Sequence, residues 1–229
     1  MLAIVLASLL MPVCLYFDLL VASNVNYFVV PGDLRTVLSC SEAFAHSYGV
    51  VLILAAIWFA SPAARKGVQS ILILLAVNCA VVAVLKNVLM RKRPRLGQAG
   101  DFESVWETFR GINPVVTELD FSRLGLSNFQ SYPSGHAATA IILGVGLATI
   151  FPRARYLFVL FALLACGQRI GFQAHYLSDV CAGIIVALVQ FTVLISTRFG
   201  KRNLLGDIPT FPVVEQWPPQ SIQSQSRAA

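Results

Sequence analysis

Long runs of apolar residues dominate the sequence and predict its secondary structure. A helix needs about 20 apolar residues to cross the hydrocarbon core of a bilayer, with a range of roughly 17 to 25. Six runs approach that length, at residues 2–20, 43–60, 69–89, 135–151, 155–173 and 179–198. The first contains Pro12 and Asp18 and is the weakest of the six. The pattern predicts an all-α protein, an integral membrane bundle of six transmembrane helices.

The polar segments between and after these runs suggest how the chain is organised. Residues 24–42 are polar enough to lie in the membrane interface before the chain turns inward. The long connection between the third and fourth runs mixes aromatic and charged residues, which favours an interfacial lid over residues 95–131. Residues 201–229 are rich in Pro, Gln and Ser, as in disordered tails. We therefore expect one membrane domain over residues 1–200, with a periplasmic lid, and a disordered cytoplasmic tail.

The composition favours the membrane as the solvent of this chain. Of its 229 residues, 57% are hydrophobic and 12% are charged, whereas soluble domains usually carry about 25% charged residues. The formal charge of +6 does not indicate nucleic acid, because the basic residues stand at the ends of apolar runs. Anionic lipid headgroups or a phosphate substrate explain them better. The five cysteines are widely spaced, which argues against both a disulfide framework and a metal site.

Basic residues also orient the predicted bundle. Six spans put both termini and the short turns 61–68 and 152–154 on one side of the membrane. That side carries Arg65, Lys66, Arg153, Arg155, Arg198, Lys201, Arg202 and Arg227. The positive-inside bias acts most strongly in such short loops, so we expect this side to be cytoplasmic. The first run has no basic flank, so we expect a retained span rather than a cleaved signal peptide.

A first polar cluster closes the third apolar run. Lys86 and Arg93 are seven residues apart, so two helical turns would bring them onto one face, about 10 Å apart along the axis. Pro94 would then end the helix. Two aligned cations can bind an anion whose charge is spread over several oxygens. The alternative is a basic cluster that extends to the membrane surface. We expect Arg91, between them, to be solvated or to face headgroups.

A second cluster, Pro133-Ser134-Gly135-His136, opens the fourth run. At a helix N-terminus, free backbone N–H groups and the helix dipole favour phosphate, so Ser134 and Gly135 are candidate phosphate ligands. A histidine ordinarily titrates near neutral pH, so His136 could protonate a leaving oxygen. The alternative is an ordinary helix start beside an interfacial histidine.

A third cluster joins the fifth and sixth runs. His175 and Asp179 are four residues apart, the spacing of neighbours on one helical turn. A carboxylate that fixes the tautomer of an imidazole makes its other nitrogen a better nucleophile. Arg169 adds a third cation. The alternative is a structural His–Asp pair that caps a helix. Because the alternating spans bring all three clusters to the same membrane face, we favour a phosphate site.

Together the patterns Lys-x6-Arg-Pro, Pro-Ser-Gly-His and Arg-x5-His-x3-Asp resemble the motifs of the type 2 phosphatidic acid phosphatase (PAP2) superfamily. The motifs cover residues 86–179. The superfamily usually has Ser where this chain has Gln168, which bears on turnover rate more than on reaction type. The resemblance implies a phosphatase of the bacterial inner membrane, without metal or cofactor, whose site faces the periplasm or exterior. It implies that Lys86, Arg93, Arg169, Ser134 and Gly135 hold the phosphoryl oxygens, that His175 attacks phosphorus, that Asp179 orients His175, and that His136 protonates the leaving group.

The implied reaction is hydrolysis of a lipid phosphate monoester or diphosphate through a phosphohistidine, with phosphatidic acid or phosphatidylglycerol phosphate as the expected substrate type. Undecaprenyl diphosphate and lipid A are alternatives, because the motifs would contact only the phosphate. A vanadium haloperoxidase, also in the superfamily, fits poorly with so apolar a chain. A non-catalytic lipid binder or transporter is the alternative from another class, but binding alone would need neither the two histidines nor Asp179. The oligomeric state is not predicted.

Overall fold

The structure is a computed structural model that describes residues 2–24, 31–89, 91–96 and 130–205. Its longer helices are α1 (Leu2–Asn24), α2 (Gly32–Ser41), α3 (Ser47–Ala60), α4 (Arg65–Val88), α7 (Gly135–Ile150), α8 (Arg155–Gly171) and α9 (Leu177–Ser196). Short turns of helix are η2 (Glu42–Phe44), η3 (Pro62–Ala64), η4 (Pro94–Leu96), η6 (Pro152–Ala154), α10 (Arg198–Gly200) and η7 (Lys201–Leu205). The all-α prediction is confirmed. Most of the predicted lid, and the tail beyond residue 205, lie outside the described residues.

Each of the six predicted apolar runs forms a helix. By length and composition, four helical segments of the described chain could cross a membrane: α1, η3 with α4, η6 with α8, and α9. A fifth span is possible if α2, η2 and α3 are one unit, which is bent by 68°. The remaining helix, α7, has 16 residues, or about 24 Å at 1.5 Å per residue. The membrane-type helical bundle is confirmed, and the count of six spans stays a prediction.

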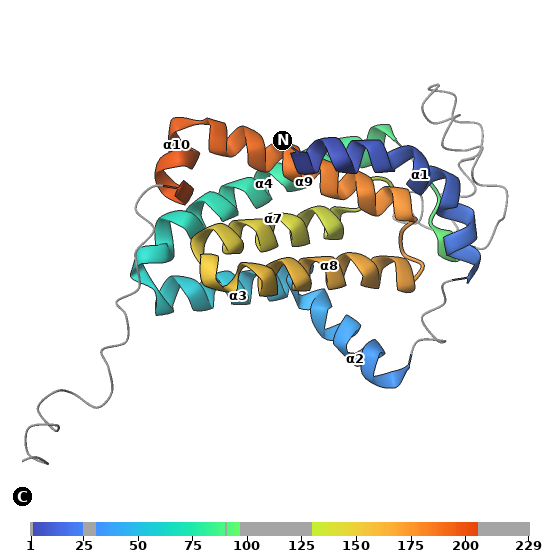
Figure 1. Cartoon of the computed structure of the whole chain (residues 1–229), viewed down its shortest axis with the longest axis horizontal. Coiled ribbons are helices and arrows are strands. Elements are labelled where there is room, and N and C mark those ends of the chain that lie inside the picture. The colour runs from blue at the N-terminus through green and yellow to red at the C-terminus, as the bar shows by residue number, and fades with distance from the viewer. Residues whose placement is uncertain (1, 25–30, 90, 97–129, 206–229) are drawn as a thin grey trace, which may run out of the picture.

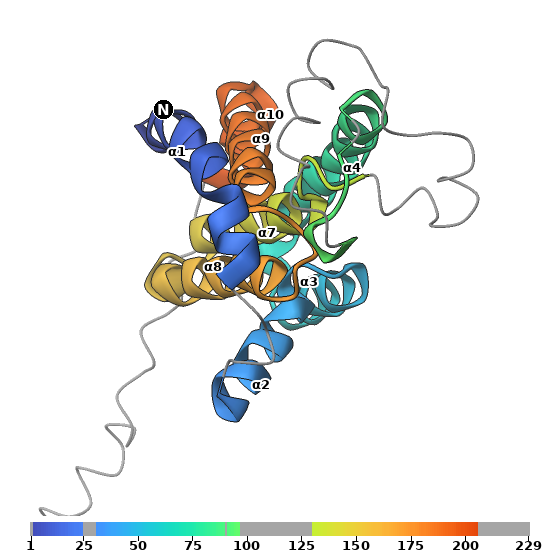
Figure 2. The same cartoon turned by 90° about the vertical axis from the view of Figure 1, so that its right-hand side faces the viewer.

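Helix α7 lies at the centre of the bundle, with α4, α8 and α9 packed around it (Figure 2). Its Ile142, Leu143 and Leu147 are completely buried. Helix α1 packs on α9 at the outside, and α2 projects away from the bundle (Figure 1). Since α7 is surrounded by protein, the non-helical chain at its ends can be covered by neighbouring segments instead of facing lipid. A helix this short can therefore occupy the core of a membrane protein.

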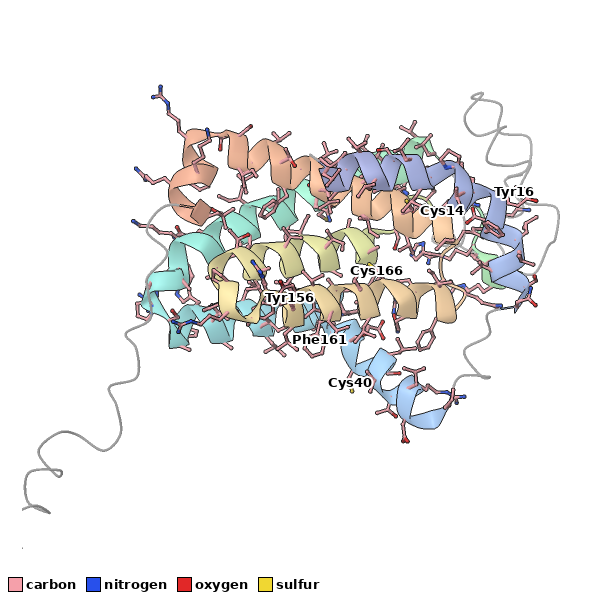
Figure 3. All side chains as sticks on the ribbon, viewed as in Figure 1. Cys14, Tyr16, Cys40, Tyr156, Phe161 and Cys166 are labelled. Carbon is pink, nitrogen blue, oxygen red and sulfur yellow. The ribbon has the colours of Figure 1, made fainter. Side chains whose placement is uncertain are left out.

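The outer surface of the bundle is apolar. Leu9 in α1 is 68% exposed, and the rings of Tyr16 in α1 and Tyr156 in α8 are also exposed (Figure 3). A soluble protein rarely presents so many large apolar side chains together. Together with the long apolar helices, this surface identifies a membrane protein. The five cysteines all lie within the described residues and are free thiols.

The basic residues of the short turns collect at one end of the bundle. Helix α4 begins at Arg65, α8 begins at Arg155, and α9 is followed by Arg198 and Lys201. These helix ends lie together on the left of Figure 1. The predicted clustering of basic residues is therefore confirmed for this part of the chain, while its cytoplasmic orientation stays a prediction.

A glycine lets α9 approach the segment that leads into α7. A Cβ atom at Gly183 would lie 2.4 Å from the carbonyl oxygen of Ser134 and 3.2 Å from the Cβ atom of Ala137. Because the nearest atom belongs to the backbone, it cannot rotate aside as a flexible side chain would. A side chain at position 183 must therefore push α9 away from the start of α7.

We expect Gly183→Ala to lower the thermal unfolding midpoint in detergent, with an overpacking cost of about 1–3 kcal/mol. The matched control is Gly167→Ala in α8, where a Cβ atom meets nothing within 4 Å. Alanine favours a helix over glycine by about 1 kcal/mol, so this control should keep or raise the midpoint. Equal midpoints for the two variants would contradict the close approach of α9.

Candidate active site

Several helices end or begin at the end of the bundle that lies opposite the basic turns. Helix α4 ends here at Val88 and α8 at Gly171, while α7 and α9 begin here, on the right of Figure 1. The turn between α8 and α9 is tight, and Gln173 within it has a left-handed φ of 51°. The Gln173 side chain donates from Nε2 to the carbonyl oxygen of Ala22, 2.9 Å away, which ties α1 to this turn. All three motif clusters therefore lie at one end of the molecule.

The segment after α4 is held between the start of α7 and the α8–α9 turn. The Ser131 N–H donates to the carbonyl oxygen of Arg91 at 3.0 Å, and the Arg95 N–H donates to that of Gln173 at 3.1 Å. The prediction that one helix carries Lys86 and Arg93 on the same face is wrong, because α4 ends at Val88. The non-helical backbone turns Arg91 and Arg93 inward, where both find buried partners.

His175 presents one ring nitrogen to a backbone acceptor and the other to a cation. Its Nδ1 lies 2.8 Å from the carbonyl oxygen of Ser131, and its Nε2 lies 3.4 Å from Nη1 of Arg93. A carbonyl oxygen can only accept, so Nδ1 carries the proton of the neutral ring and Nε2 keeps its lone pair. The ring is 2% exposed. Burial lowers the pKa of His175 below its ordinary value, because desolvation disfavours the imidazolium and outweighs the attraction of Asp179.

Asp179 contacts both His175 and the start of α9. Its Oδ2 lies 3.7 Å from Nδ1 of His175 and accepts hydrogen bonds from the Tyr176 N–H at 2.9 Å and from Oγ of Ser131 at 2.5 Å. The carboxylate is completely buried. The predicted His–Asp contact and the alternative capping role therefore coexist. Nδ1 of His175 donates its hydrogen bond to the carbonyl oxygen of Ser131, and the sequence offered no signal for Ser131.

A buried ion triad supports Asp179 from the other side. Arg91 Nη1 contacts Oδ1 of Asp179 at 2.5 Å, and its Nη2 contacts Oδ2 of Asp18 at 2.8 Å. Its guanidinium carbon lies 4.0 Å from the ring centroid of Tyr176. Asp18 also accepts from the N–H and Oγ of Ser178, at 2.8 and 2.5 Å. Since Arg91 is 3% exposed, the expectation that it is solvated is wrong.

Lys86 and His136 line a cavity of about 700 Å³ between α3, α4 and α7. Most of its wall is apolar, with Val50, Leu72, Leu75 and Val82 among the lining residues. His136 interacts electrostatically with Lys86, Arg169 and His175. The rings of His46 and His136 have centroids 6.0 Å apart. The cavity thus joins a polar end, which carries Lys86, Gly135 and His136, to an apolar interior.

The start of α7 uses its serine to cap the helix. Ser134 Oγ accepts from the Ala137 N–H at 3.3 Å, and the Ser134 N–H donates to the carbonyl oxygen of Asp179 at 2.9 Å. Gly135 lines the cavity beside His136. The predicted phosphate ligands Ser134 and Gly135 are therefore near the site, with the Ser134 side chain already engaged within the protein.

Arg169 lies in the last turn of α8 and is held by two side chains. Its Nε donates to Oε1 of Gln168 at 2.5 Å, and its Nη2 donates to Oε1 of Glu42 at 2.7 Å. Gln168 also donates from Nε2 to Oε2 of Glu42 at 3.2 Å. Arg169 is close enough to act electrostatically on Arg93 and His136. The residue that departs from the superfamily pattern thus belongs to a network around this cation.

The structure brings the eight predicted residues to one end of the bundle. Lys86 interacts electrostatically with Arg93 and Asp179, which links the first cluster to the third. Among the described residues there is no group of three or more His, Cys, Asp or Glu side chains that could hold a metal ion. The roles of the eight residues, and a reaction without metal, stay predictions.

Comparison with known proteins agrees with this arrangement. The PAP2 superfamily profile matches residues 66–203. The lipid A 1-phosphatases of Rhizobium johnstonii and Rhizobium etli are 37% and 40% identical to the chain over 81 residues, which is 35% of this chain. That segment spans 33% and 34% of the two relatives, so the chain covers only a third of their length. No solved structure matches the chain. The profile covers more than half of the chain, including all three motifs, and the chain belongs to the PAP2 superfamily.

Proposed function

We propose that the protein is a membrane phosphatase that hydrolyses a lipid phosphate monoester or diphosphate. The observation that carries this proposal is the state of His175. Its Nδ1 is hydrogen-bonded to the Ser131 carbonyl oxygen, and its Nε2 faces Arg93. A neutral imidazole with an unprotonated nitrogen beside a cation suits nucleophilic attack on a phosphorus atom that the cation holds. A binding protein would need the cations but no such nucleophile.

In the first step, Nε2 of His175 attacks phosphorus and the bond from phosphorus to the lipid oxygen breaks. Arg93, Lys86 and Arg169 neutralise the charge on the phosphoryl oxygens, which phosphoryl transfer chiefly requires. Nδ1 keeps its proton, which is hydrogen-bonded to the Ser131 carbonyl oxygen. The buried Asp179 carboxylate beside the ring offsets the positive charge that develops on the imidazole. The product is a phosphohistidine.

His136 completes the reaction at the leaving group. It lies on the cavity wall and interacts electrostatically with His175. His136 in its imidazolium form would donate its proton to the departing lipid oxygen, which becomes a hydroxyl group while the ring becomes neutral. Water then attacks the phosphohistidine, the N–P bond breaks, and inorganic phosphate leaves, with His136 taking up the proton of the water.

The apolar cavity supports a lipid as the carrier of the phosphate. Its polar end holds Lys86 and His136, and its wall between α3 and α4 is apolar. Fully burying one large aliphatic side chain contributes about 1.5–3 kcal/mol, so an acyl or isoprenoid chain in this cavity would supply much of the binding free energy. The extracytoplasmic position of the site is part of this proposal, since the basic turns lie at the opposite end of the bundle.

A second candidate substrate comes from the comparisons. The two curated relatives are named lipid A 1-phosphatases, so a phosphate of lipid A is an alternative to phosphatidic acid or phosphatidylglycerol phosphate. All of these lipids present a phosphate at a membrane surface, and the described site residues would contact only that group.

The experiment is a phosphate-release panel with purified protein in detergent and EDTA. It compares phosphatidic acid, phosphatidylglycerol phosphate, undecaprenyl diphosphate and lipid A. We expect turnover of at least one lipid with EDTA present. No release from any of the four, with or without added divalent metal, would contradict the proposed function. The preferred lipid in the panel would identify the substrate class.

A further inference from the structure

Glu42 forms a closed ring of hydrogen bonds with Gln168 and Arg169. One carboxylate oxygen accepts from Nη2 of Arg169 at 2.7 Å, and the other accepts from Nε2 of Gln168 at 3.2 Å. The ring closes where Nε of Arg169 donates to Oε1 of Gln168 at 2.5 Å. A serine at position 168 has no amide and could not make both contacts. Glu42 belongs to η2, at the bend between α2 and α3.

The carboxylate of Glu42 occupies a donor that the proposed reaction assigns to phosphate. The side chain of Arg169 is 10% exposed, so little water can reach its guanidinium to replace a partner that leaves. The Glu42 side chain, by contrast, is 37% exposed. A partly solvated carboxylate can leave a cation at much lower cost than a fully buried one. The contact is therefore of the kind that a stronger anion can displace.

We propose that Glu42 competes with phosphate for Arg169 and so makes the site discriminate against free inorganic phosphate. This inference rests on the proposed function. A lipid phosphate gains binding free energy from its chains in the apolar cavity and can overcome the competition. Inorganic phosphate has only its charge, and the nearby carboxylate opposes that charge directly. The consequence is weak product inhibition at a site that carries three cations.

The test is equilibrium binding of radiolabelled inorganic phosphate to the purified full-length protein in detergent. In Glu42→Gln the side chain keeps its shape and an oxygen that can accept from Arg169, but it loses the negative charge. We expect the Kd for phosphate to fall on the order of tenfold, as for one charge removed a few ångströms away. The inhibition constant for phosphate in lipid hydrolysis should fall in parallel. Glu42→Ala should also lower the Kd for phosphate, and it is the second variant if Glu42→Gln fails to fold.

The matched control is Asp33→Asn, which removes one negative charge from the exposed first turn of α2. Its Kd for phosphate should equal that of the wild type. Unchanged or weaker phosphate binding in Glu42→Gln and Glu42→Ala would overturn the inference, because Glu42 would then only hold Arg169 in place. If the wild type neither binds phosphate nor hydrolyses a lipid, the proposed function fails as well. If it hydrolyses lipid and only the Glu42 variants miss the expectation, the competition alone is wrong.

Discussion

His175→Ala is expected to abolish phosphate release from the preferred lipid, with kcat reduced by at least about 10³-fold. The variant loses the nitrogen that we propose attacks phosphorus, which lies beside Nη1 of Arg93. Water attacking directly would lack this positioned nucleophile. The measurement is initial phosphate release in detergent with EDTA, with both proteins at matched concentration.

Phosphate binding by the same variant is the control for its folding. Lys86, Arg93 and Arg169 remain in His175→Ala, so inorganic phosphate should still bind with a Kd within about tenfold of the wild type. Loss of both binding and turnover would point to a collapsed site instead of a missing nucleophile. Undiminished turnover would exclude His175 from the chemistry.

Arg91→Met is expected to give the largest loss of stability, about 3–5 kcal/mol. Methionine fills much of the volume but leaves Asp18 and Asp179 buried without their shared cation. Both carboxylates are completely buried, so solvent cannot replace the guanidinium. The measurement is the unfolding midpoint in detergent as temperature or SDS concentration is raised.

Lys66→Met is the control for Arg91→Met, since Lys66 is exposed at the opposite end of the bundle. It should unfold within about 0.5 kcal/mol of the wild type. Adding Asp18→Asn to Arg91→Met should restore part of the lost stability, because only one uncompensated carboxylate would remain. Similar midpoints for Arg91→Met and Lys66→Met would show that the triad is not buried as described.

The helices were predictable because apolar run length directly reports which segments can form buried or lipid-facing helices. The end of α4 was not. Local helix propensity continues past Val88, but Arg91 leaves the helix to meet Asp18 and Asp179, which are 73 and 88 residues away in sequence. Such long-range ion pairs override local preference. Asp18 was the one indication in the sequence of this ion pair, because a carboxylate within an apolar run requires a buried partner.

The meeting of the motif residues at one end of the bundle was predictable from residue type and spacing, while their supporting contacts were not. Ser131 holds His175 through a backbone carbonyl, which no side-chain pattern reports. Glu42 reaches Arg169 across 127 positions in sequence. Gln168 departs from the superfamily pattern, and in the structure its amide donates to Glu42. Sequence spacing does not predict which distant residue pairs with each charged side chain.

Trapping the phosphoenzyme tests most directly whether His175 is the nucleophile. Purified protein is mixed with lipid substrate carrying ³²P in its phosphate, quenched within milliseconds to seconds, and digested for mass spectrometry under alkaline conditions, which preserve phosphohistidine. We expect one labelled peptide, phosphorylated on His175 and absent from His175→Ala. Label on a different residue, or rapid turnover with no labelled protein at any quench time, would contradict the claim that His175 attacks phosphorus.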